Sequence, residues 1–198
     1  MSKGKIIIIN KRVILDFKMC ISEYLVLMSI VKSERKFRTM HKGTRIRYSE
    51  IKGIDIANEL LINPSNVSRH INKLKRKYCI DKTKFGYCVA EHIESYFNDV
   101  SNSDCILFYN DVRLYEFCKT PEQILIAMYL WNEFYIKSKE LKVNEVFTNI
   151  PVDKKTVYNA IDDLNNNQTI REWKNKVVFS SKAKQIFYDV INESEINY

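Results

Sequence analysis

Two pairs of similar segments run through the chain, and this internal repetition constrains its fold more than any other feature. Residues 6–17 read IIIINKRVILDF, and residues 106–117, 100 positions later, read ILFYNDVRLYEF. Each segment begins with an apolar run, has Asn at its fifth position and ends in an acid followed by Phe. Such self-similarity indicates one supersecondary unit that is used more than once.

The second pair comprises residues 63–74 and 153–164, which align without a gap at an offset of 90. This offset places Asn63 on Asp153 and Leu74 on Leu164. Since the first pair has an offset of 100, the first half holds about ten extra residues between its repeats, and the basic stretch 32–52 can accommodate them. The repeats predict two domains of common size, 1–100 and 101–198.

The order of the expected elements is the same in both halves. Each opens with a β-hairpin signal, around Asn10-Lys11 and Asn110-Asp111, and continues with a helix capped by Ser22 or Thr120. A short helix follows, clearest at 56–61, and then a second helix capped by Asn63 or Asp153. Hairpin-like stretches at 79–90 and 168–180 and closing helices at 91–99 and 182–193 complete the order.

This order and spacing are typical of a winged helix-turn-helix. The small Ala57 lets two helices approach, while Val67, Ile71 and Leu74 recur on one helical face. The predicted fold class is α+β, mainly α, with two tandem winged helix-turn-helix domains related by internal duplication.

Charge is distributed unevenly between the halves. Residues 1–100 carry 20 Lys and Arg against 10 Asp and Glu, whereas residues 101–198 carry 12 against 14. A strongly basic half is a common footprint for nucleic acid. A solvated surface is the alternative that charge alone leaves open.

Composition and motifs argue against several other classes of protein. No apolar run reaches the roughly 20 residues of a membrane helix, and no signal-peptide cleavage site follows the first apolar stretch. The odd count of 5 Cys without a CxxC pair indicates reduced thiols, so we expect a cytoplasmic protein that makes no membrane contact.

The sequence also lacks the common motifs of enzymes and metal sites. No Gly-rich phosphate loop, nucleophile elbow or HExxH occurs. His41 and His92 have no partner at metal-ligand spacing, and His70 is expected to be a partly buried structural residue. We therefore expect no enzymatic activity, no cofactor and no metal.

The helix after Asn63 supplies the main candidate site. With its apolar positions inward, the outward side chains suit a major groove: Arg can bond guanine, Asn can bond adenine, and Ser and Lys can bind phosphate. The helix contains no acid. A basic solvated helix is the alternative. The predicted DNA-binding residues of this helix are Ser65, Asn66, Ser68, Arg69, Asn72, Lys73 and Arg76.

Two other segments of the first half extend this candidate surface. Lys82 and Lys84 lie at the tip of the predicted wing, where a backbone or minor-groove contact is natural, although exposure alone would also explain them. The stretch 32–52 is expected to be either a flexible loop that follows phosphates or a solvated insertion.

The second copy of the helix differs in charge. Lys154, Lys155 and Tyr158 allow a DNA contact from its N-terminal end, but Asp162 and Asp163 would repel phosphate further along. This surface either binds DNA more weakly or meets a protein. A basic second wing is expected from Arg171, Lys174 and Lys176.

Residues 21–25 (ISEYL) and 120–124 (TPEQI) begin the first long helix of each half. In this plan the chain resembles plasmid replication initiators of the tandem winged-helix type, in which an N-terminal strand precedes a helix of the form Leu-Ser-x-x-Glu-Gln-Lys. The resemblance implies binding to repeated origin sequences, homodimerisation through one winged helix, and recruitment of host replication proteins.

The predicted function is sequence-specific binding of double-stranded DNA, most concretely as the replication initiator of a plasmid or phage. Two alternatives stay open at this point. One is a transcriptional regulator or DNA-transfer accessory factor that binds a single operator-like site. The other is a winged-helix scaffold for protein–protein contacts, which the acids of the second copy favour and the basic first half opposes.

Overall fold

The protein is an α+β molecule that is mainly helical. The computed structural model describes residues 5–41, 47–98, 105–173 and 176–196. The chain forms two compact units. We call residues 10–105 the N-terminal unit; among the described residues, the C-terminal unit combines residues 5–9 with residues 106–196.

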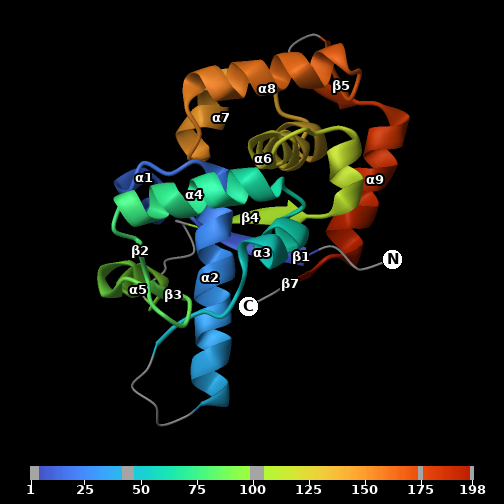
Figure 1. The fold of residues 1–198 in the computed structure, drawn as a ribbon. Coiled ribbons are helices and arrows are strands. Elements are labelled where there is room, and N and C mark those ends of the chain that lie inside the picture. The colour runs from blue at the N-terminus through green and yellow to red at the C-terminus, as the bar shows by residue number, and fades with distance from the viewer. Residues whose placement is uncertain (1–4, 42–46, 99–104, 174–175, 197–198) are drawn as a thin grey trace. The chain divides into compact units, whose positions relative to one another are not determined.

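In the N-terminal unit, helices pack around the long helix α2. The two helices α3 and α4 both contact α2, and α4 lies across it (Figure 1). An antiparallel hairpin follows, in which Ile80 pairs with Val89. The elements are α1 (Lys11–Asp16), α2 (Ile21–Met40), α3 (Gly53–Leu60), α4 (Pro64–Arg76), β2 (Ile80–Lys82), β3 (Tyr87–Val89) and α5 (Glu91–Asn98).

The C-terminal unit has its own helical core and hairpin. The side chains of Trp131, Phe179 and Phe187 meet in an aromatic cluster within it. Its elements are β1 (Lys5–Asn10), β4 (Cys105–Asn110), the 3₁₀ helix η2 (Val112–Glu116), α6 (Pro121–Tyr129), the π-helical segment η3 (Leu130–Ile136), α7 (Val143–Asn149), α8 (Lys154–Asn166), β5 (Ile170–Trp173), β6 (Lys176–Phe179), α9 (Ser181–Glu193) and β7 (Glu195–Ile196).

The strand β1 is the middle strand of a three-stranded sheet with the order β4-β1-β7. It runs parallel to β7, with Lys5 opposite Glu195. Residues 5–9 therefore belong to the C-terminal unit, although the sequence predicted a first domain of 1–100. The predicted domain boundary near residue 100 stays a prediction. The strand β1, up to Ile9, groups with the other half of the chain.

The second halves of the two units repeat one local structure at a constant offset. The helices α4 and α8 are each 13 residues long and begin 90 positions apart. The strands β2 and β5 also begin 90 positions apart, and so do the helices α5 and α9. Left-handed backbone follows each long helix, at Tyr78 and at Gln168. The offset of 90 that the sequence displays is thus present in the backbone.

The β-hairpins predicted around Asn10-Lys11 and Asn110-Asp111 are wrong, because a helix follows the strand at each place. The side chain of Asn10 accepts a hydrogen bond from the Arg12 N–H (2.9 Å) and caps α1, so a helix follows β1 directly. Asp111 accepts from the Arg113 N–H (2.9 Å) in the same way and begins η2. Asn and Asp mark helix starts as readily as turns, which is why the hairpin reading failed.

The first long helix also differs from its prediction. Cys20, not Ser22, is the N-cap of α2, and the helix continues to Met40. The first part of the stretch 32–52 is therefore helical, so it is not the flexible loop that the sequence suggested; residues 42–46 lie outside the described residues. The other predicted caps, at Asn63, Thr120 and Asp153, are confirmed.

None of the helices within the described ranges is long and apolar enough to cross a bilayer.

Candidate nucleic-acid interface

Helix α4 is strongly two-sided. Val67, Ile71 and Leu74 are buried against the unit, as their spacing predicted. At its start, the Asn63 side chain accepts hydrogen bonds from the Ser65 N–H (2.9 Å) and the Ser65 hydroxyl (2.7 Å), and Pro64 is the first helical residue. A neutral cap leaves the positive end of the helix dipole uncompensated.

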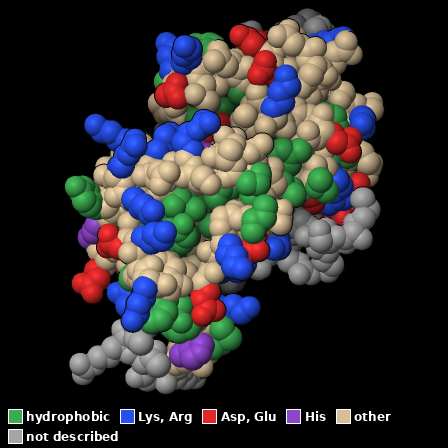
Figure 2. All heavy atoms as spheres, viewed as in Figure 1, with side chains coloured by type: hydrophobic (Ala, Val, Ile, Leu, Met, Phe, Trp, Pro, Cys, Tyr) green, Lys and Arg blue, Asp and Glu red, His purple; other side chains and the backbone are tan. Residues whose placement is uncertain are grey.

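The opposite face of α4 carries a stripe of exposed polar side chains. Ser65, Arg69, Asn72 and Arg76 follow one another at helical spacing and are all exposed. Neither arginine forms an ion pair with a residue that the structure describes. Lys and Arg side chains gather around the end of α4 that leads into β2 (Figure 2). Ser68 is exposed as well, and Asn66 is half-buried.

Lys73 differs from the other predicted contacts because it binds a buried acid. Its ammonium group lies 2.8 Å from Glu23 on α2, and Lys77 lies 2.6 Å from the same carboxylate. Burial raises the pKa of Glu23, but the hydrogen bonds from Lys73 and Lys77 outweigh it, so the pKa is lowered. These bonds fasten the last turns of α4 to α2. Lys73 therefore helps to hold α4 in place against α2.

Replacing this carboxylate should change how stability depends on pH. The pKa of Glu23 in the folded protein lies below its ordinary value, so its stabilisation is complete above about pH 5 and is lost as the pH falls through the lowered pKa. We expect Glu23→Gln to cost about 2 kcal/mol at pH 7 and progressively less in acid. Urea denaturation at several pH values measures this. The exposed Glu50→Gln is the control; equal losses in both variants would contradict the account.

The same acid belongs to a group of side chains that could bind a metal ion. Ligand atoms of Cys20, Glu23 and His70 all lie within 4.8 Å of one another. Both carboxylate oxygens of Glu23 face ammonium groups of Lys73 and Lys77, however, and these cations disfavour a metal ion. The His70 side chain is only 13% exposed, as expected for a partly buried histidine.

The hairpin β2–β3 presents Lys82 and Lys84, which are both exposed. Its turn is fixed by Thr83, whose hydroxyl oxygen accepts hydrogen bonds from the Phe85 N–H (3.2 Å) and the Gly86 N–H (3.1 Å). The Lys84 ammonium group lies 4.7 Å from the Phe85 ring centroid. The predicted wing lysines thus lie at the end of β2 and in its turn, in the same unit as α4.

Two arginines of the stretch 32–52, Arg38 and Arg47, serve the interior of the unit instead. Buried Glu34 lies 3.0 Å from Arg47 and accepts a hydrogen bond from the Val89 N–H (2.8 Å). Arg38 and Arg47 also pair with Glu94 on α5. These arginines stabilise the fold, so their charge adds little to an external phosphate surface.

Helix α8 repeats the geometry of α4 with different charges. Lys154, Lys155 and Tyr158 are exposed, and the Lys154 ammonium group lies 5.7 Å from the Tyr158 ring. Its cap is the anionic Asp153, whose pKa is lowered by hydrogen bonds from the Thr156 hydroxyl and N–H. A carboxylate at this end competes with phosphate for the helix dipole.

One polar contact links α4 to α2 and, at the matching position, α8 to α6, but the acid lies on the opposite partner. Where α4 has Lys73 bound to Glu23, α8 has Asp163, which accepts a hydrogen bond from Gln123 on α6 (2.7 Å). Asp163 is therefore turned inward, and Asp162 is the exposed acid of the predicted pair. Of the expected second wing, Arg171 and Lys176 are exposed, and Lys174 lies outside the described residues.

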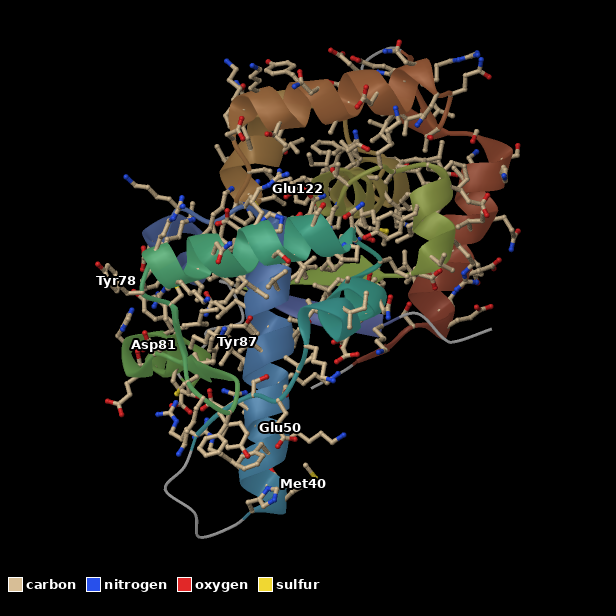
Figure 3. The ribbon with its side chains drawn as sticks, viewed as in Figure 1. Met40, Glu50, Tyr78, Asp81, Tyr87 and Glu122 are labelled. Atoms are coloured by element: carbon tan, nitrogen blue, oxygen red, sulfur yellow. The ribbon has the colours of Figure 1, made fainter. Side chains whose placement is uncertain are left out.

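Some surface residues were not singled out by the sequence. Tyr78, which is 77% exposed, lies where α4 turns into β2 (Figure 3). Phe85 at the hairpin tip is 52% exposed. Large aromatic residues within predicted turns were the available signal.

Comparison with protein-family models, with curated proteins and with solved structures finds no match to this chain.

Proposed function

We propose that the protein binds double-stranded DNA through the N-terminal unit, with α4 in the major groove. The observation that carries this proposal is the exposed stripe of α4, in which Arg69 and Arg76 are not neutralised by any described acid. Arg and Asn side chains at helical spacing can reach successive base edges. Lys82 and Lys84 would contact the backbone beside the groove.

The proposal includes a tandem winged-helix architecture. The repeated order of two helices, a hairpin and a further helix at an offset of 90 supports it. In that architecture α4 is the recognition helix and β2–β3 is the wing. The C-terminal unit, with Asp153 at its helix start and Asp162 exposed, is better suited to a supporting DNA contact or to a protein partner than to base reading.

Within this class, the proposed role is initiation of replication on a plasmid or phage, with a homodimer and host replication proteins as partners. A transcriptional regulator or DNA-transfer accessory factor would use the same α4 surface on a single site. A protein scaffold is the remaining alternative, and the acids of α8 favour it for the C-terminal unit alone.

Substitution of one arginine tests the proposed groove contact. Arg69→Ala should weaken binding to the best duplex site by about 2 kcal/mol, as the loss of a bidentate base contact would. Sites selected from a random library, followed by fluorescence anisotropy, provide the measurement. Lys119→Ala, which removes an exposed charge from the C-terminal unit, is the matched control. Unchanged affinity in the Arg69 variant would remove Arg69 from the base-reading set.

A further inference from the structure

Four aromatic rings form a continuous row on the N-terminal unit, in which two of the three neighbouring pairs are stacked and the Phe37–Tyr48 pair is tilted by 40°. The ring centroids of His41 and Phe37 are 4.2 Å apart, those of Phe37 and Tyr48 are 4.2 Å apart, and those of Tyr48 and Phe85 are 5.3 Å apart. The row runs from the end of α2, marked by Met40 in Figure 3, to the tip of the hairpin β2–β3. It ends in Phe85, half of whose surface is exposed.

The backbone around Phe85 is held rigidly. The segment before α3 adds a bridge to the hairpin, with the Ser49 N–H donating to the Tyr87 carbonyl (2.6 Å) and the Tyr87 N–H donating to the Ser49 carbonyl (3.1 Å). Gly86 has φ +155°, and a Cβ atom there would lie 2.0 Å from the Ser49 carbonyl oxygen. Only glycine fits this approach. The exposed ring is therefore preorganised, which lowers the entropic cost of binding a ligand.

The charges beside the ring suit a ligand with a flat face and an anionic backbone. Lys84 approaches the Phe85 ring, and Lys82 is exposed on the adjoining strand. Acids lie in the same region: Glu50 accepts a hydrogen bond from the Tyr48 hydroxyl (3.3 Å), and Asp81 is exposed on β2. Aromatic rings with neighbouring cations are the recurring arrangement for single-stranded nucleic acid, because every base has a π-face.

We propose that Phe85, backed by Tyr48 and Phe37, stacks on an unpaired base of single-stranded nucleic acid, with Lys82 and Lys84 on the adjacent phosphates. Bases within a duplex are already stacked and present no free face. The ligand is therefore an unpaired strand, and this site differs from the duplex contact of α4 in both residues and chemistry.

Two variants of the whole 198-residue chain test this site. Phe85→Leu keeps an apolar side chain but removes the ring, and should weaken binding of a labelled oligothymidylate of about 16 nucleotides about tenfold. Its binding to a duplex should not change. Phe85→Trp keeps the ring, and the fluorescence it adds to the wild-type signal should be quenched when the oligonucleotide binds. An oligouridylate of equal length distinguishes DNA from RNA.

Three results would overturn the proposal: no binding of the wild-type protein to either single strand at low salt, equal affinity in Phe85→Leu and wild type, or an equal loss of duplex binding in Phe85→Leu. The last would place Phe85 in the duplex interface. Failure of the duplex proposal gives a different result. In that case the protein does not bind duplex DNA, but it still binds the oligothymidylate in a Phe85-dependent manner.

Discussion

Replacing Arg69 and Arg76 together by asparagine should lower the affinity for duplex DNA about a hundredfold or more. Both arginines lie on the exposed face of α4, and each base or phosphate contact of this kind contributes about 1–3 kcal/mol. Asparagine is the residue that α8 carries at the same two positions, Asn159 and Asn166, so the helix surface should tolerate it. Fluorescence anisotropy at constant salt measures the change.

A control for the double variant must remove the same charge elsewhere. Lys36→Asn combined with Lys119→Asn does so at two exposed positions outside α4. We expect this control to lose only the small, nonspecific share of affinity that follows from net charge. If both double variants lost the same affinity, the attraction would come from overall charge, and α4 would have no special role.

Removing the carboxylate of Glu34 should have the largest effect on stability. Glu34 is 1% exposed, and Glu34→Ala would leave the Val89 N–H without its acceptor and remove the buried carboxylate that Arg47 contacts, although Arg47 would keep its pair with Glu94. Breaking a buried pair from one side costs about 4 kcal/mol. Urea denaturation followed by circular dichroism measures the free energy of unfolding.

Two further variants define the Glu34 result. Glu34→Gln retains an oxygen that can accept from Val89, so its loss should be smaller than that of Glu34→Ala. Glu50→Ala, at an exposed acid in the same unit, should change the stability by no more than about 0.5 kcal/mol. A Glu34→Ala variant as stable as the Glu50→Ala variant would contradict the structural role of Glu34 and its contacts with Arg47 and Val89.

Local signals predicted much of the fold. The caps at Asn63, Thr120 and Asp153 depend on neighbouring residues only, and the structure contains all three. The same type of signal misled at Asn10, because an Asn after an apolar run can begin either a turn or a helix. The Asn10 side chain marks the end of β1, but its residue type alone does not determine whether a turn or the helix α1 follows.

The pairing of distant segments could not be predicted from local patterns. The isoleucine run of β1 suits any sheet, and its partners β4 and β7 come from the far part of the chain. Likewise, Glu23 and Lys73 are 50 positions apart, so the sequence could not show that Lys73 binds an acid within the unit. The candidate surface was therefore predicted by residue type, while its division into exposed and internally paired cations required the structure.

The most direct test of duplex binding is the affinity of the full chain for random duplex DNA across a salt series. If α4 and the hairpin contact the backbone, log affinity should fall linearly with log salt, with a slope of about −0.9 for each phosphate neutralised, and the Arg69→Asn/Arg76→Asn variant should bind more weakly at every salt concentration. Negligible binding at low salt, or affinity that does not respond to salt, would contradict DNA binding by this protein.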